Sequence, residues 1–230
     1  AAAAVAAVAP LFTKQGARAA VTRRPLTSTF TDAFTIYRMD GVFIFLLAAA
    51  FIQSSHGAYY AFASNIWIAQ GIDGGHIGAL WAMGVAAEIL LLLFSRRLLG
   101  GLSPLTLLWM GGLGAAVRWT AAGFVLPVES VYVLQTLHAA SFALTHLAVM
   151  RFLEDRLPTE QLPLAYAANG ALIFGPAMAI TSFAAGLAYD ALAPGGISEQ
   201  TKLYWLMVTV TLGGLLLTWR AGRRTPAETS

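Results

Sequence analysis

Residues 51–62 have the sequence FIQSSHGAYYAF and lie inside a long apolar run. Four of them, Gln53, His56, Gly57 and Tyr60, follow the i, i+3, i+4, i+7 spacing of one helix face. Counted from the start of the run at ~1.5 Å per residue, His56 falls near the middle of a membrane span. Polar groups at that depth are costly, so they predict either the wall of a water-filled cavity or hydrogen bonds between packed helices.

The composition places this run in a membrane protein. The 230 residues are 58% hydrophobic and 11% charged, whereas soluble domains carry roughly 25% charged residues. Several apolar blocks exceed the ~20 residues that cross a bilayer as a helix. The chain has no cysteine, which excludes disulfides and thiolate metal sites. Its net charge of +3 is better explained by basic loops at a membrane surface than by binding of nucleic acid.

Six spans are expected, so the predicted fold is an all-α bundle of six transmembrane helices. Breaks rich in Gly, Pro and Asp separate the apolar runs. The expected spans are 41–69, 77–95, 104–126, 129–151, 163–190 and 202–220.

Basic loops alternate with loops that carry few or no basic residues. By the positive-inside rule both termini then lie in the cytoplasm, as an even number of spans requires. We expect a multi-pass protein of a bacterial inner membrane. Its expected regions are the end of a preceding helix at 1–12, a basic cytoplasmic linker at 13–40, the bundle at 41–222 and a cytoplasmic tail at 223–230.

Ionisable residues are few inside the spans. Glu88 is the only carboxylate well inside any of them, and hydrocarbon favours its neutral form, so a proton can reside there. Arg118 is the only deep guanidinium and needs an anion, either a carboxylate or a solute. We therefore expect Glu88 and Arg118 to pair, as a static brace or as a working pair that opens when a proton or solute arrives.

The fourth span contains LQTLHAASFALTHLA, in which Gln135, His138 and Ser141 share a helix face. Counted from the outer end, His138 lies ~14 Å deep and Arg118 ~10 Å deep, at a similar level. His146 lies closer to the cytoplasm, where a gate or relay role and an ordinary contact between helices are equally plausible.

No enzyme is expected. The chain has no phosphate-binding P-loop, no HExxH and no GxSxG motif. Asp73 and His76 form the only candidate catalytic pair, and capping of a turn explains them better. His56 lies in the first span and His138 and His146 in the fourth, with little carboxylate support, so we expect neither a metal nor a cofactor.

The six-span pattern after a basic linker resembles the C-terminal half of a major facilitator superfamily transporter. Within it, QSSHGAYYAF and LQTLHAASFALTHLA resemble the 3-phenylpropionate transporter-like branch, which is related to lactose permease and the nucleoside:proton symporters. The resemblance covers residues 41–222. It implies proton-coupled symport of a small organic solute.

The lactose permease family has an Arg twenty positions before a His, as Arg118 precedes His138 here. That family places a proton-carrying Glu three positions after the His, where this chain has Ser141. In that family a Glu follows a Met-Gly pair. Here Val85 follows Met83 and Gly84, and the acid lies one turn further on, at Glu88. The resemblance therefore implies proton transfer by Glu88, or a different form of coupling.

The phenylpropionate branch implies an aromatic carboxylate, with Arg118 as counter-ion and Tyr59 or Tyr60 as stacking face. We expect one shared wet pocket to hold these groups. Its expected solute-binding residues are Gln53, His56, Tyr59, Tyr60, Arg118, Gln135 and His138, and its expected proton-coupling residues are Glu88 and His138.

Superfamily transporters need two six-helix halves. We expect the partner to be a missing N-terminal half, or a second copy of this chain. The alternative function is a non-transporting scaffold or sensor whose polar residues bind a lipid or a subunit.

Overall fold

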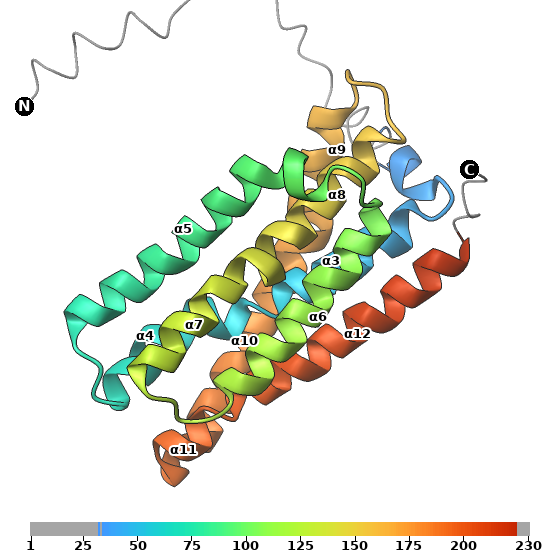
Figure 1. Ribbon diagram of the computed structural model, residues 1–230. Helices are drawn as coiled ribbons and strands as arrows, with labels where there is room; N and C mark the ends of the chain where they lie inside the picture. The colour runs from blue at the N-terminus through green and yellow to red at the C-terminus, as the bar shows by residue number, and fades with distance from the viewer. Residues whose placement is uncertain (1–31, 33, 225–230) are drawn as a thin grey trace, which may run out of the picture. The chain divides into compact units, whose positions relative to one another are not determined.

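The computed structural model describes residue 32 and residues 34–224. Its helices correspond to the six predicted spans (Figure 1). They are α3 (Val42–Ser54) with α4 (Gly57–Ala69); α5 (Gly74–Leu99); α6 (Pro104–Ala122); α7 (Val128–His138) with the π-helical η2 (Ala139–Ala143) and α8 (Leu144–Glu154); α9 (Leu162–Ala168) with the π-helical η3 (Asn169–Phe174) and α10 (Gly175–Leu192); and α12 (Leu203–Arg224). Two short elements, η4 (Ala193–Gly195) and α11 (Ile197–Gln200), precede α12. The predicted all-α architecture is confirmed.

The N-terminal limits of two helices follow from capping side chains. Asp73 precedes α5 and accepts hydrogen bonds from the backbone N–H groups of Gly75 and His76 at 2.8 and 3.2 Å. The bond from His76 lowers the pKa of Asp73. Ser103 caps α6 in the same way, followed by a proline that suits a first helical position.

Five helical segments of the described chain are long and apolar enough to cross a membrane. The exception is the α6 segment, which has 19 residues. Its mean hydropathy is lowered by Arg118 and by several glycines. It packs against α8 and α12, and its Arg118 and Trp119 are buried. The chain is therefore a multi-pass membrane protein.

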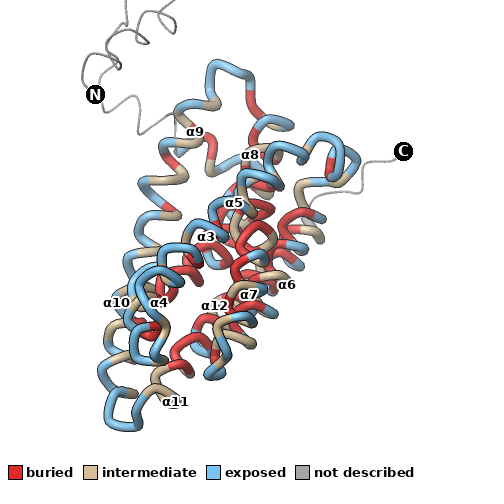
Figure 2. Tube along the Cα trace, turned by 60° about the vertical axis from the view of Figure 1, so that its left-hand side comes forward, coloured by how far each residue is buried: buried red, intermediate tan, exposed pale blue. Residues whose placement is uncertain are grey.

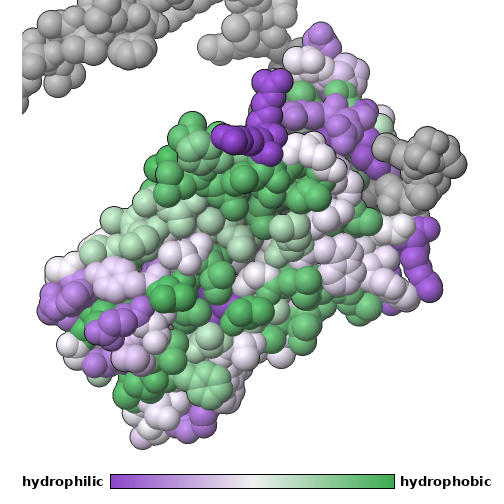
Figure 3. Space-filling model, in the orientation of Figure 1, coloured by the Kyte–Doolittle hydropathy of each residue, from purple (hydrophilic) through white to green (hydrophobic). Residues whose placement is uncertain are grey.

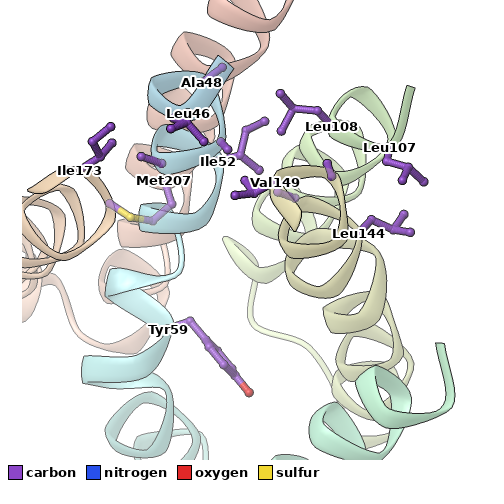
Figure 4. Close-up of a cluster of buried hydrophobic side chains, with 14 of the residues drawn as sticks. Leu46, Ala48, Ile52, Tyr59, Leu107, Leu108, Leu144, Val149, Ile173 and Met207 are labelled. Carbon is purple, nitrogen blue, oxygen red and sulfur yellow. The ribbon is translucent and has the colours of Figure 1, made fainter. Parts of the chain in front are cut away.

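Helices α3, α6 and α12 contact one another, and α8 packs on α3 and α6, around an aliphatic core (Figure 4). Small residues allow this approach: a Cβ on Gly112 would meet Leu215 at 2.5 Å, and one on Gly214 would meet Ile52 at 2.7 Å. In Figure 4, Tyr59 lies apart from the aliphatic side chains and directs its hydroxyl away from them.

The outer helices bury little of their surface within the bundle. Only 11% of the most apolar part of α5 and 6% of that of the α9–α10 segment is buried, against 78% for the α3–α4 segment. Figure 2 shows the same contrast along the trace. In Figure 3, apolar residues cover the middle of the visible face and polar residues gather toward its ends, as expected for helices that cross a bilayer.

Several predicted regions are outside the described residues. The predicted helix end at 1–12 lies there, as do most of the predicted linker at 13–40 and of the predicted tail at 223–230. Residues 34–38 of the linker are helical.

Candidate functional site

The stretch FIQSSHGAYYAF contains a break between α3 and α4 at Ser55 and His56. The carbonyl groups freed by the break are bonded by side chains. Ser55 Oγ donates to the carbonyl of Ile52 at 2.6 Å, and Thr181 Oγ1 donates to the carbonyl of Ser54 at 2.7 Å. Trp119 Nε1 donates to Ser55 Oγ at 2.8 Å. Part of the polar chemistry in this stretch therefore stabilises a broken helix.

The fourth span departs from α geometry beside this break. Its π-helical segment η2 starts directly after His138 and includes Ser141. Gln53 Nε2 donates to the carbonyl of Phe142 in η2 at 3.4 Å. Such π-helical insertions are frequent at functional sites, because they reorient the side chains around them.

Arg118 is the centre of a buried network, with only 2% of its surface exposed. Its Nη1 atom lies 2.6 Å from His138 Nδ1, and its Nη2 donates to Gln135 Oε1 at 2.7 Å. A longer bond of 3.4 Å runs from Nη1 to Ser141 Oγ. The expectation that Arg118 and His138 lie at one depth agrees with this contact.

Aromatic rings complete the surroundings of Arg118. The guanidinium carbon lies 4.4 Å from the ring centroid of Tyr59 and 4.7 Å from that of Trp119. Both contacts are cation–π interactions, which strengthen when the cation is removed from water. Arg118 forms no direct ion pair with any side chain of the described residues, so its charge is held by neutral acceptors and ring faces.

His138 separates Arg118 from Glu88. Its Nε2 atom lies 2.6 Å from Glu88 Oε1, on the opposite side of the ring from Arg118. The expected direct pair of Glu88 and Arg118 is therefore wrong for the described residues. The imidazole occupies the space between the two groups and contacts both.

The hydrogen bonds fix the protonation of His138. A guanidinium can only donate, so Nδ1 must be the acceptor, and the proton of the neutral ring resides on Nε2. Glu88 Oε1 consequently accepts a hydrogen bond from the N–H group at Nε2. Tyr60 Oη lies 3.4 Å from the same Nε2.

His56 takes the opposite tautomer when its ring is neutral. Its Nδ1 lies 3.0 Å from the carbonyl of Gln53, which can only accept, and its Nε2 lies 3.1 Å from Ser141 Oγ. Ser141 thus accepts from Arg118 and donates to His56. His56 is fully buried, and its contacts are those of a residue that joins helices.

A large cavity of about 620 Å³ lies on one side of this network. Gln53, Glu88 and His146 line it, together with Asn169, whose buried Oδ1 has no partner. It extends toward the end of the bundle where α8 and α9 meet, because Met150 and Tyr166 also line it.

A small cavity of about 30 Å³ lies on the other side. Tyr59, Arg118 and Gln135 line it, and it extends toward Gln70 and Leu126 at the opposite ends of the helices. Gln135 is 1% exposed, and its Nε2 has no hydrogen-bond partner.

The expectation of one shared pocket is therefore wrong. Gln53 and Glu88 line the large cavity, whereas Tyr59, Arg118 and Gln135 line the small one. The packed side chains of His138 and Ser141 fill the space between. Tyr60 is 42% exposed and lines neither cavity.

Two contributors to the site were absent from the predicted set. Trp119 covers Arg118 and bonds to Ser55, and Tyr204 of α12 stacks on Trp119 with ring centroids 5.8 Å apart. Trp119 directly follows Arg118 in the sequence, and this position indicated that its ring lies near the guanidinium. Nothing in the sequence near Tyr204 links it to the third span.

Residues 1–197 match the MFS_1 like family. This chain belongs to that family. A relative described as "Probable 3-phenylpropionic acid transporter", from Escherichia coli (strain K12), is 31% identical over 173 residues. The aligned region covers 75% of this chain and 44% of the relative, so the chain spans less than half of that protein. The predicted resemblance to the 3-phenylpropionate branch of the major facilitator superfamily is confirmed.

Proposed function

We propose that this chain is one helical half of a secondary active transporter that moves a small organic solute together with protons. Membership of the MFS_1 like family and the description of the relative as a probable transporter support transport as the function class. The observation that carries the proposal is the line from Glu88 through His138 to Arg118, which lies between two cavities.

Two cavities on opposite sides of one polar layer suit alternating access. A transporter must expose its site to one side of the membrane while the other side is closed. Here the large cavity extends toward the end of the bundle with Arg96, Arg97 and Arg151, the expected cytoplasmic end. The small cavity at the other end has space for only a few water molecules. This arrangement fits a state that faces the cytoplasm.

His138 is proposed to couple the proton to the solute. Protonation of its neutral ring adds an N–H at Nδ1, and that hydrogen points at the guanidinium 2.6 Å away. Two donors and two positive charges at that distance repel each other. Arg118 must then move from His138 and becomes available to an anion, while the charged ring is stabilised by Glu88.

An aromatic carboxylate is the proposed solute class. A carboxylate matches the forked donors of Arg118, which has no carboxylate partner in the described chain. The rings of Tyr59 and Trp119 next to that guanidinium offer aromatic contact. The relative's description names such an acid, 3-phenylpropionic acid.

A second six-helix unit is the proposed partner. The largely exposed α5 and α9–α10 segments would gain burial from another bundle, either the other half of a longer protein or a second copy. The basic loops support a topology with both termini in the cytoplasm. The bacterial origin of the relative supports a bacterial inner membrane as the location.

Uptake into proteoliposomes tests the proposal. The chain, assembled with its second six-helix unit, should accumulate 3-phenylpropionate faster under an inward proton gradient. Glu88→Gln should abolish gradient-driven uptake and spare solute exchange. Glu129→Gln, in the exposed first turn of α7, is the matched control and should leave uptake unchanged.

Two results would contradict the proposal. Equilibration that ignores the gradient would indicate a uniporter. Unaltered uptake by Glu88→Gln would remove this carboxyl from the mechanism.

A further inference from the structure

A third hollow lies at the end of the bundle where basic residues gather, separate from both cavities of the transport site. Its volume is about 700 Å³. Four parts of the chain line it: the start of α3, the turn between α5 and α6, the end of α8 and the end of α12. None of the residues in the Glu88–His138–Arg118 network contributes to it.

Arg151 forms part of its wall and is held by the end of α5. Its Nη1 donates to the carbonyl of Leu99 at 2.7 Å and to that of Leu102 at 3.4 Å. These bonds orient the guanidinium and cap the last turn of α5. They use only one of its three nitrogens, so other N–H donors stay available to a ligand.

Arg156 is the second guanidinium of the wall and is held by stacking. Its guanidinium carbon lies 3.9 Å from the ring centroid of Phe152. Phe152 in turn stacks on Phe45, with ring centroids 3.7 Å apart and planes at 4°. Both rings are 2% exposed, so they form a fixed support that places Arg156 at low entropic cost.

Neither arginine forms an ion pair with a carboxylate among the described residues. The ion pairs at Asp73, Glu88 and Glu199 involve neither Arg151 nor Arg156. Asp155 also lines the hollow, which leaves a net positive wall. Two oriented guanidiniums around a cavity offer the geometry that binds a phosphate group.

We propose that this hollow binds the phosphate of an anionic phospholipid between Arg151 and Arg156. The apolar side chains of Phe45, Leu105 and Phe152 also line the hollow and suit the glycerol and the start of an acyl chain. A hollow of about 700 Å³ is in the range of sites for organic ligands, which favours a lipid over a free phosphate ion. The basic segment at residues 13–24 has the wrong sign of charge to fill it.

Thermal unfolding of the purified chain in lipid nanodiscs tests the site without any transport assay. Phosphatidylglycerol should raise the unfolding temperature more than phosphatidylcholine with the same acyl chains. Arg156→Gln should weaken the retention of phosphatidylglycerol about tenfold, because a charge-assisted hydrogen bond is lost. Arg97→Gln, at the same end of the bundle but outside the hollow, should behave as the unaltered chain.

A second pair of variants tests the effect of charge in the hollow while both arginines are kept. Gly101 lines it, and a Cβ there would meet no atom within 4 Å, so a side chain fits. Gly101→Asp should repel the phosphate and abolish the preference for phosphatidylglycerol. Gly101→Asn has the same size without the charge and should retain the preference.

Three results would overturn the proposal. The first is a preference for phosphatidylglycerol that persists in both Arg156→Gln and Gly101→Asp. The second is equal stabilisation by phosphatidylcholine. The third is stabilisation by inorganic phosphate that is as strong as that by the lipid. This result would show that the hollow binds free phosphate and not a phospholipid.

Discussion

The Nδ1 atom of His138 lies 2.6 Å from Nη1 of Arg118. A guanidinium donates only, so this contact assigns the acceptor role to Nδ1 and the proton to Nε2. His56 has its Nδ1 against a carbonyl and takes the other tautomer. Nitrogen NMR of labelled histidines should find the proton of His138 on Nε2 and that of His56 on Nδ1. A proton on Nδ1 of His138 in the solute-free state would contradict the assignment.

Gln135→Glu places a carboxylate at the position that now accepts from Arg118 Nη2. An ion pair at that site should compete with the carboxylate of a solute for the guanidinium. We expect solute affinity to fall at least tenfold while the chain keeps its thermal stability. The affinity can be measured by calorimetry, with the surface change Gln161→Glu as control. Unchanged affinity in Gln135→Glu would show that Arg118 does not meet the solute.

Gly111 permits the close contact of α6 with α8. A Cβ at this position would lie 2.2 Å from Thr145 Oγ1 and 3.1 Å from its backbone nitrogen. Gly111→Ala should therefore destabilise the bundle by about 1–3 kcal/mol through overpacking. Gly78→Ala in α5, where a Cβ meets nothing within 4 Å, should be neutral or stabilising. Equal unfolding temperatures for the two variants would refute this account of the contact.

The cap of α5 should give stability that depends on pH. Backbone N–H groups lower the pKa of Asp73, so its charged form favours the folded chain. This contribution is present at pH values above the ordinary range of an aspartate, and it disappears as the pH falls through the lowered folded value. Asp73→Asn can still accept the bonds but does not titrate. The acid side of its stability profile should be flatter than that of the unaltered chain.

The spans and the depth of the site could be predicted from sequence. Runs of apolar residues fix which segments are helical in a membrane, because unpaired backbone groups are not tolerated there. Counting residues from the ends of those runs places Arg118 and His138 at one level. Both inferences need only helix rise and hydropathy.

The contacts among the polar side chains at that depth could not be predicted from the sequence. Whether Glu88 meets Arg118 directly depends on how each helix is rotated, and His138 took the place between them. The break at Ser55 and the π-helical η2 shift side chains by a fraction of a turn. These shifts place Gln53 and Tyr59 at different cavities, although both lie in one stretch of the first span.

The most direct test of the account is whether water and solute reach Glu88 through the large cavity. The chain has no cysteine, so single cysteines can be introduced without background. Leu92 lines the large cavity one turn from Glu88, while the neighbouring Leu93 is exposed outside that lining. In membranes, Leu92→Cys should react with a water-soluble thiol reagent much faster than Leu93→Cys, and 3-phenylpropionate should slow that reaction. Equal rates at the two positions, with no protection by the acid, would contradict the account.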